Sequence, residues 1–393
     1  MLVILLALAL VPAADPPAFV VESVRNERLA GDFVRINADG TAQVGDVAIP
    51  VGEFIALRRP GAPPARPNDR PHLLLGNGDR IPGRLLAIEN DRAQVAADLG
   101  HEVPMVIPLT AISAIWMVPR AAGRLAGPGQ FDASALRPKD VLRLTNGDAI
   151  PGTVVSVARN GPVRFETGES SSDIARDRID AIIFSTELAR PLRSKGPVGR
   201  LVTRNGGRIR LWKLSSDADS INGELLFGGA LRIPWSEVAV LTIEGGAMRY
   251  LSDLKPIRYE STPFFGLSWP LAIDQSAVRG DLRLGGGTFD KGLGLHSACR
   301  ATVAIPARSI RFAASVGLDD VTGRRGAANV RFLLDGQAIP DSRFELLGGQ
   351  SPYEAVFALP SGARELTIVV EFGPGGDVQD HVNLGDARFI LTP

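Results

Sequence analysis

The sequence predicts an all-β protein, in which an N-terminal array of small β-barrel-like repeats is followed by a C-terminal jelly-roll β-sandwich. Three observations predict this fold class. The 393 residues include 43 glycines and 29 prolines between mostly short apolar runs, which is typical of strands joined by tight turns. A residue pattern recurs through residues 20–248 about every 60 positions. From residue 250 onwards, apolar and polar residues alternate over whole strands.

Composition narrows the class of partner. Lys+Arg and Asp+Glu both number 43, so the formal net charge is zero, and we expect no nucleic-acid partner because phosphate neutralisation needs a local excess of cations. Cys299 is the single cysteine in the sequence. It can form no intrachain disulfide and no cysteine-built zinc site.

The N-terminus predicts export. Residues 1–11 are uninterruptedly apolar and are followed by Pro12-Ala13-Ala14, which is typical of a signal peptide over residues 1–14. Eleven residues are too few to span a bilayer, which needs about 20. No later run reaches that length, so we expect a secreted or periplasmic chain with no membrane span once processed. A buried strand or an uncleaved anchor are the alternative interpretations of this segment.

The repeated unit opens with an Asn-Gly step. The segment LGNGDRIPG at residues 75–83 returns as LTNGDAIPG at residues 144–152, and a looser copy begins at Asn205. Asn-Gly between apolar runs predicts a type I′ hairpin turn, whose two central residues both need positive φ. We interpret Asp79 and Asp148, which follow these turns, as parts of Asx turns rather than as metal ligands.

The unit closes with an isoleucine that has apolar residues five and eight positions later. The four copies are Ile49/Phe54/Leu57, Ile107/Ile112/Ile115, Ile174/Ile179/Ile182 and Ile233/Val238/Leu241. They divide the region 20–248 into four predicted units: 20–60, 72–118, 139–186 and 198–245. Units of this size are marginal alone, so neighbouring units are expected to pack together as a spacer or a protein-contact array.

The C-terminal segment, residues 250–393, predicts a separate sandwich. Apolar residues alternate with polar ones in Leu366/Ile368/Val370/Phe372, for example, which indicates strands with one buried face. Turn residues such as Asp335-Gly336 and Ser361-Gly362 separate these strands. Several such strands without a convincing helix indicate a two-sheet sandwich of jelly-roll type.

The same segment contains side chains suited to carbohydrate. Sugars are bound by planar polar groups that meet several hydroxyls and by an aromatic face for the apolar side of the ring. The candidate carbohydrate-binding residues are Trp269, His296, Asp319, Asp320, His381, Asp386 and Arg388. Tyr259 and Tyr353 are further candidate aromatic faces.

Each candidate also has a purely structural interpretation. Asp319-Asp320 could close a turn, His296 could be a buried core histidine, and Trp269 could pack against the core. Asp386 and Arg388 could form an internal ion pair. We predict no cofactor; a calcium ion is possible, with oxygens from Asp319, Asp320 and Asp377, although their spacing matches no calcium loop.

Specific motifs of this segment carry a family resemblance. Gly292-Leu293-Gly294-Leu295-His296, then Val316-Gly317-Leu318-Asp319-Asp320 and Asp380-His381, occur in the order seen in the NPCBM type of carbohydrate-binding module, which residues 250–393 resemble. The resemblance implies a β-sandwich that binds sugars such as galactose, is often appended to glycoside hydrolases and sometimes holds calcium. The family usually has an acidic residue and a tryptophan after the Asp-His pair, whereas this chain has Asn383-Leu384-Gly385.

The sequence predicts a binding protein rather than an enzyme. It contains no G-x-S-x-G, P-loop or H-E-x-x-H motif, and no large domain that could hold the paired carboxylates of a glycosidase. We therefore expect an exported, non-catalytic carbohydrate-binding protein, with protein partners possible through the repeats. The alternative is a structural protein–protein interaction protein with a vestigial sugar site.

Overall fold

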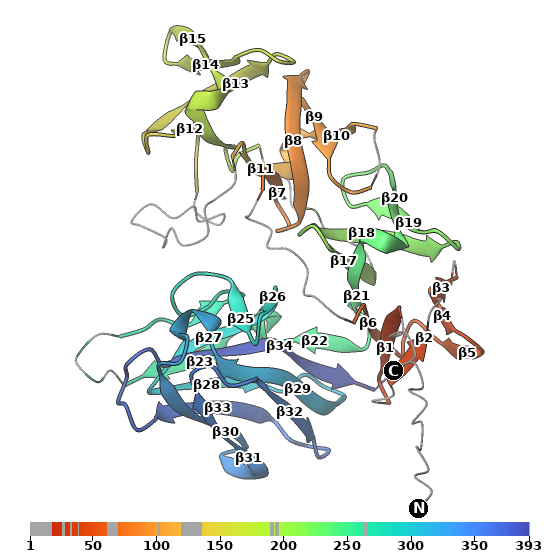
Figure 1. Ribbon diagram of the computed structural model, residues 1–393, viewed down its shortest axis with the longest axis vertical. Helices are drawn as coiled ribbons and strands as arrows, with labels where there is room; N and C mark the ends of the chain where they lie inside the picture. Colours follow the sequence, from red (N-terminus) through yellow and green to blue (C-terminus); the bar gives the residue numbers. More distant parts are fainter. Residues whose placement is uncertain are drawn as a thin grey trace, which may run out of the picture.

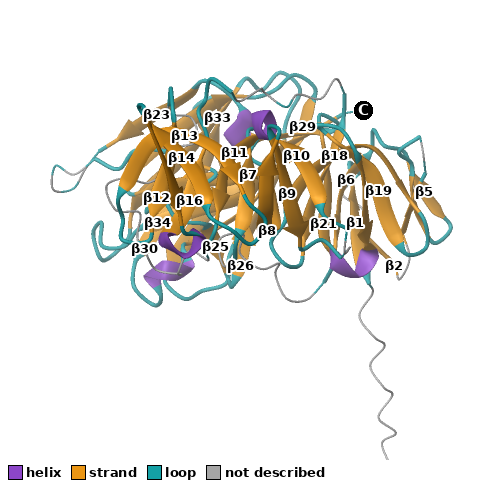
Figure 2. Cartoon of the chain, turned by 90° about the horizontal axis from the view of Figure 1, so that it is seen from above, coloured by secondary structure: helices purple, strands orange, loops and turns teal. Residues whose placement is uncertain are grey.

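The computed structural model describes residues 18–25, 28–31, 34–37, 39–60, 70–100, 103–118, 136–188, 192, 196–262, 264, 266 and 268–392. Within this part of the chain, the regular elements are β-strands and five single-turn 3-10 helices (Figure 2). The predicted all-β fold class is confirmed. The predicted signal peptide, residues 1–14, lies outside the described residues. Among the residues that are described, no helix has the length and apolar character needed to cross a membrane.

Four groups of strands, which we call units 1 to 4, form the N-terminal array. Unit 1 contains β1 (Phe19–Ser23), β2 (Arg28–Gly31), β3 (Val34–Ile36), β4 (Ala42–Val44), β5 (Val47–Ile49) and β6 (Phe54–Arg58). Unit 2 contains β7 (His72–Leu75), β8 (Arg80–Glu89), β9 (Arg92–Ala97), β10 (Met105–Pro108), η1 (Leu109–Ala111) and β11 (Ile112–Trp116). In both units the first strand pairs with the last one, which closes the unit.

Units 3 and 4 repeat the arrangement of unit 2. Unit 3 contains β12 (Asp140–Leu144), β13 (Ala149–Val157), β14 (Val163–Thr167), β15 (Ser170–Ile174), η2 (Arg176–Arg178) and β16 (Ile179–Ile183). Unit 4 contains β17 (Val198–Thr203), β18 (Arg208–Ser216), β19 (Ser220–Leu225), β20 (Ala230–Pro234), η3 (Trp235–Glu237) and β21 (Val238–Glu244). In both, a 3-10 turn again precedes the last strand, which pairs with the first.

The closing pattern of each unit spans this 3-10 turn. In unit 2, Ile107 lies in β10, Ile112 begins β11 and Ile115 lies within β11, and each is at most 1% exposed. The intervals of five and three residues do not fit the two-residue period of one continuous strand. They arise because the turn η1 separates β10 from β11. The turn thus lets all three side chains reach one core.

The Asn-Gly loops are not type I′ turns, so that expectation is wrong. Leu75 N donates to Asp79 O (2.8 Å) and Gly78 N donates to Leu75 O (3.0 Å), which makes a three-residue loop. Only Gly78 in this loop has positive φ, at 85°. A type I turn followed by a left-handed glycine has this geometry. In unit 2, a two-residue turn with two positive φ values occurs instead at Asn90-Asp91, between β8 and β9, at 49° and 56°.

The two aspartates that follow the Asn-Gly loops have different partners. The Asx contact is made by the asparagine, because Asn77 Oδ1 accepts from Asp79 N at 3.0 Å. The Asp79 carboxylate is buried and accepts from Arg210 Nη1 (2.6 Å) and Arg210 N (2.9 Å) in unit 4. Asp148 is exposed and accepts from Asn146 Nδ2. Asp79 therefore joins two units.

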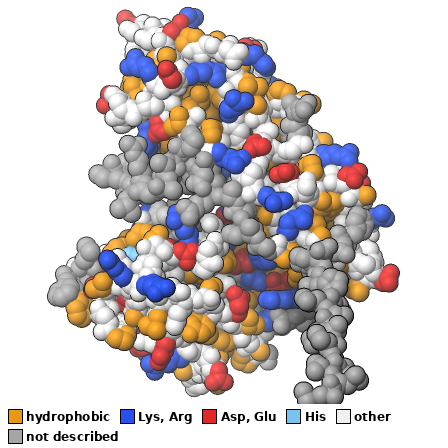
Figure 3. Space-filling model, in the orientation of Figure 1, with side chains coloured by type: hydrophobic (Ala, Val, Ile, Leu, Met, Phe, Trp, Pro, Cys, Tyr) orange, Lys and Arg blue, Asp and Glu red, His pale blue; other side chains and the backbone are white. Residues whose placement is uncertain are grey.

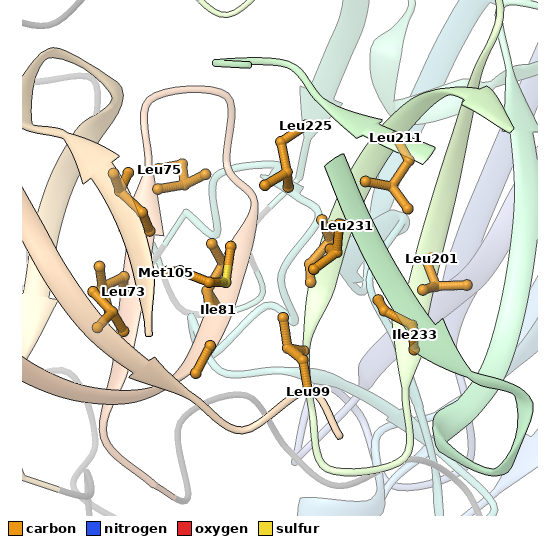
Figure 4. Packing of buried hydrophobic residues seen from close by; sticks show 14 of the residues in the cluster. Leu73, Leu75, Ile81, Leu99, Met105, Leu201, Leu211, Leu225, Leu231 and Ile233 are labelled. Carbon is orange, nitrogen blue, oxygen red and sulfur yellow. The ribbon is translucent and has the colours of Figure 1, made fainter. Parts of the chain in front are cut away.

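The units pair through their last strands. β6 of unit 1 pairs with β21 of unit 4, and β11 of unit 2 pairs with β16 of unit 3. These strands are apolar on both faces, as in the segment FIALR of β6, because each lies between its own first strand and a second unit. Units 2 and 4 share a core, in which Leu73, Ile81 and Met105 face Leu225 and Leu231 (Figure 4). The spatial order is therefore 1–4–2–3 (Figure 1).

The C-terminal part is a two-sheet β-sandwich, as expected. One sheet contains β24 (Ala272–Ile273), β27 (Gly292–His296), β34 (His381–Leu391), β29 (Ser309–Leu318) and β32 (Tyr353–Ala358), with β22 (Met248–Tyr250) also paired to β34. The other contains β23 (Ile257–Ser261), β28 (Cys299–Ala304), β33 (Glu365–Phe372), β30 (Ala327–Leu334) and β31 (Gln337–Leu347). A hairpin of β25 (Leu282–Leu284) and β26 (Gly287–Phe289) flanks them. Phe312, Phe332 and Phe389 are fully buried in the core.

The sandwich packs against units 1 and 4 at a surface that we call the junction. Its apolar centre contains Val24 and Ile55 of unit 1 with Met248, Tyr250 and Ile390 of the C-terminal part. Acidic and basic side chains lie side by side around this centre (Figure 3). Ion pairs across the junction are Arg388–Glu22, Arg58–Asp386, Arg200–Asp290 and Arg208–Asp290.

Candidate functional site

Three of the predicted site residues meet at one end of the sandwich. The Trp269 and His296 rings are stacked, with centroids 4.4 Å apart and an interplanar angle of 6°. The His381 ring lies 5.3 Å from Trp269 and 5.2 Å from His296. We call these three side chains the Trp–His cluster.

Sheet register brings the two histidines together. His296 is the last residue of β27, His381 is the first residue of β34, and the two are directly opposite each other in this antiparallel pair. The Gly-Leu-Gly-Leu-His motif has a packing role here, because a Cβ on Gly294 would lie 2.4 Å from Gln275 O and 2.5 Å from Ala277 N. Glycine therefore lets the preceding segment pack directly on β27. On the other side, Tyr259 Oη donates to Trp269 O (2.9 Å) and holds the tryptophan backbone.

Within the cluster, His381 is uncharged at neutral pH. His381 is 9% exposed, and its Nδ1 has no hydrogen-bond partner in the described part of the chain. Burial, together with the neighbouring His296, lowers the pKa of His381 to about 4. His296 Nδ1 lies 2.8 Å from Ser297 O, which can only accept, so this nitrogen carries the proton. In the neutral ring, Nε2 of His296 is then an acceptor.

The buried carboxylate of Asp380 hydrogen-bonds to the residue that follows His296 of the cluster. Asp380 is 1% exposed; its Oδ2 accepts from Ser297 Oγ (2.6 Å) and its Oδ1 accepts from Ala327 N (3.0 Å). Burial raises the pKa of Asp380. Ser297 and Asp380 are not among the site residues predicted from the sequence, although Asp380 belongs to the Asp-His pair of the family-like motif. Both side chains orient the backbone on either side of the two histidines.

Asp319 and Asp320 have structural partners. Asp319 is fully buried, and its carboxylate accepts from Val321 N (2.9 Å) and Asn383 Nδ2 (2.8 Å). Burial raises the pKa of Asp319. Asp320 accepts from the backbone N–H groups of Gly285 and Gly286 in the β25–β26 hairpin. Asp319 N donates to His381 O (2.8 Å), so this turn lies beside the cluster without presenting its carboxylates to it.

Asp386 and Arg388 lie away from the cluster, in the junction. Arg388 Nη2 donates to both carboxylate oxygens of Glu22, at 2.8 and 2.9 Å, and Asp386 pairs with Arg58. Five and seven residues of extended strand separate them from His381, a distance of about 16–23 Å. Their charged groups form ion pairs with side chains of unit 1, so we do not include them in the candidate site. No sequence signal linked them to Glu22 and Arg58, which come from unit 1.

The remaining candidates are dispersed. Tyr353 is 39% exposed on β32, where its ring lies 5.4 Å from that of Phe344. Among the described residues, no three His, Cys, Asp or Glu side chains are grouped so that they could hold a metal ion. Calcium binding by Asp319, Asp320 and Asp377 remains a prediction.

Comparison with known proteins identifies the C-terminal part. The family model described as NPCBM/NEW2 domain matches residues 247–390. A Renibacterium salmoninarum protein named "Putative endo-alpha-N-acetylgalactosaminidase" is 27% identical over 165 residues, which are 40% of this chain and 10% of that protein. The chain therefore spans about a tenth of the length of this curated relative.

Two solved structures from Clostridium perfringens are also similar. One is CBM51 of GH95 in complex with methyl-galactose, with 21% identity and a TM-score of 0.33 over 36% of this chain and 99% of that chain. The other is CBM51-2 in complex with GlcNAc and the INT domains of ZmpB, with 16% identity and a TM-score of 0.34 over 47% and 42% of the respective chains. The resemblance noted in the sequence is thus confirmed by the family model, and residues 247–390 are an NPCBM/NEW2 domain.

Proposed function

We propose that this chain is an exported, non-catalytic carbohydrate-binding protein whose NPCBM/NEW2 domain holds a galactose-type sugar at the Trp–His cluster. One observation carries the proposal. The half-buried Trp269 indole is stacked on His296 and backed by His381, so an aromatic face is held in one orientation at the edge of the domain. Galactose is the sugar type that the family resemblance implies.

The chemistry of the cluster suits a sugar ring. The apolar face of a pyranose packs on the exposed part of an indole, and a ring nitrogen of the neutral His381 imidazole can hydrogen-bond to a hydroxyl. Because the rings of Trp269 and His296 are already stacked, binding would cost little side-chain entropy. Asp380 has both carboxylate oxygens in hydrogen bonds, so it orients the site and is not a free acid or base.

In this proposal, units 1 to 4 are a scaffold that holds the domain in a set orientation. The junction contacts β22, β29 and β34 of the sandwich and uses Asp386 and Arg388. The Trp–His cluster lies at the other end of β34, so the scaffold leaves the sugar site accessible. The units are proposed to span residues 20–60, 72–118, 139–186 and 198–245.

Two measurements test the proposal. The first is a glycan-array screen with and without calcium, and the second is a calorimetric titration of the full chain with methyl β-galactoside. We expect binding that Trp269→Ala weakens at least tenfold, a change of about 1.4 kcal/mol. Tyr353→Ala is the matched control, because it removes an exposed aromatic ring from β32, elsewhere in the same domain. Absence of binding to any glycan by the folded protein would favour the protein-interaction role, and equal binding by the Trp269→Ala variant would show that the sugar site lies elsewhere.

A further inference from the structure

A groove of about 540 Å³ lies beside the Trp–His cluster, on the segments around η4 (Leu251–Asp253) and β24. Its walls are mainly apolar and include Leu254, Ile257, Leu271 and Ile273. Ile273 is 38% exposed, and Leu254, Ile257 and Leu271 are each partly exposed. Apolar surface of this kind is stabilised when a ligand removes it from water.

The groove also contains polar groups. Lys255 lies on it as an exposed side chain. Ser252, which also lines the groove, is 3% exposed, and its hydroxyl has no hydrogen-bond partner within the described ranges. The apolar residues nevertheless outnumber these two polar ones in the lining of the groove.

Two chain segments connect the groove to the cluster. Ile257 and Tyr259 are two residues apart on β23 and therefore project from the same face, about 7 Å from each other. Tyr259 donates to the carbonyl of Trp269, and Ile257 lines the groove. Leu271, another lining residue, comes two positions after Trp269. These two links place lining residues of the groove close to Trp269.

We propose that the groove is a second subsite, which receives an apolar aglycone (an alkyl or aryl group) joined to the bound sugar. This inference rests on the proposed function of the cluster. The sugar packs on Trp269, while its apolar substituent lies along Leu254, Leu271 and Ile273 and removes them from water. The preferred ligand is therefore a glycoconjugate with an apolar group at the reducing end rather than a free monosaccharide.

The experiment compares the affinities of methyl and n-hexyl β-galactoside in calorimetric titrations of the full chain. A titration with n-hexyl β-glucoside measures the affinity that the alkyl group gives without the galactose ring. We expect the hexyl galactoside to bind at least tenfold tighter than the methyl galactoside. Ile273→Asp should remove this gain and leave methyl galactoside affinity unchanged. Ile310→Asp is the matched control, because Ile310 is 36% exposed in the same domain outside the groove and its variant should retain the gain.

Each contrary result has a separate meaning. Equal affinities for the two galactosides, or a gain that survives in Ile273→Asp, would overturn the subsite and leave the sugar site intact. Failure of the unmodified protein to bind either galactoside would overturn the proposed function together with the subsite. Binding of methyl galactoside also reports whether Ile273→Asp is folded; if that variant does not fold, the milder Ile273→Ser takes its place, with the same expected loss of the gain.

Discussion

His381 shows at the level of one residue how packing holds an imidazole uncharged. Its ring is enclosed by Trp269 and His296, and its Nδ1 has no protein partner in the described structure. Charging this ring would place a cation next to a second imidazole in a poorly solvated position. The lowered pKa is thus a consequence of the same packing that orients the indole.

We predict that His381 makes the protein more sensitive to acid. Its pKa is about 4 in the folded state, below its ordinary value of 6.5, so the unfolded state binds more protons between these two values. The free energy of unfolding should therefore fall as pH is lowered from about 6.5 to 4, in excess of other titrating groups. Urea unfolding of the unmodified protein and of His381→Gln at pH 7 and pH 4.5 measures this difference.

The comparison between variants is needed because other groups titrate with the opposite sign. Burial raises the pKa values of Asp319 and Asp380, so protonation of these carboxyls stabilises the folded state as pH falls. The stability difference between the two proteins isolates His381. If that difference is the same at both pH values, the imidazole is not held neutral by burial.

Single residues also show which site predictions depended on distant partners. Trp269, His296 and His381 could be selected from chemistry and motif, and the structure brings them together. Asp319 and Asp320 looked equally suitable, but their carboxylates accept from Asn383 Nδ2 and from the glycine N–H groups of a flanking hairpin. A carboxylate's role depends on which donors the fold places around it, and local sequence does not specify them.

Among the elements, the Asn-Gly hairpin loops of units 2 and 3 each depend on one glycine. Gly147 has a φ of 97°, which an L-residue adopts only with strain, and no atom lies within 4 Å of the Cβ position. The glycine requirement therefore comes from backbone conformation and not from crowding.

We predict that Gly147→Ala destabilises the β12–β13 hairpin by about 1 kcal/mol. Native-state hydrogen exchange of the amides in these two strands measures the change. Gly52→Ala is the control, because Gly52 lies in a turn with equally open surroundings and without the positive φ. Equal protection in the Gly147→Ala variant and the unmodified protein would contradict the strain.

The last strand of each unit shows why the array is ordered 1–4–2–3. Such strands as IDAII in β16 and VAVLTIE in β21 are apolar on both faces, which indicates a central position in a sheet. The pattern shows that each strand needs a second partner. The pattern cannot show that β6 pairs with β21 and that β11 pairs with β16, because all four strands present a similar surface.

For the whole molecule, the junction makes the NPCBM/NEW2 domain part of one body with units 1 and 4. Asp290 of the domain lies between Arg200 (2.8 Å) and Arg208 (2.7 Å) of unit 4. Burial alone would raise the pKa of Asp290, but Arg208 and Arg200 hold it well below its ordinary value. The carboxylate remains charged, and its contribution to stability is retained down to strongly acidic pH.

We predict that Asp290→Asn lowers the free energy of unfolding by about 3–5 kcal/mol, because it leaves the buried Arg208 guanidinium without its anion and Arg200 with Glu244 alone. Urea unfolding followed by tryptophan fluorescence measures this change. Glu365→Gln is the control, since the Arg258–Glu365 pair of the same domain is exposed (62% and 44%) and should contribute less than about 1 kcal/mol.

The same variant separates stability from binding. The junction lies away from the Trp–His cluster, so folded Asp290→Asn protein should bind methyl β-galactoside with unchanged affinity. Equal destabilisation by Asp290→Asn and Glu365→Gln would show that the junction is hydrated and contributes little to stability.

From the amino-acid sequence we could infer that this chain is all-β, that its C-terminal third is an NPCBM-like sandwich, and that Trp269, His296 and His381 are suited to a sugar. Alternation, turn residues and short motifs are local properties, and they act within a few residues of chain. The folded structure was needed to establish the order of the units, the assignment of Asp386 and Arg388 to the junction, and the groove close to Trp269. Those features depend on contacts between distant segments, whose buried faces and charges have many compatible partners until the chain is folded.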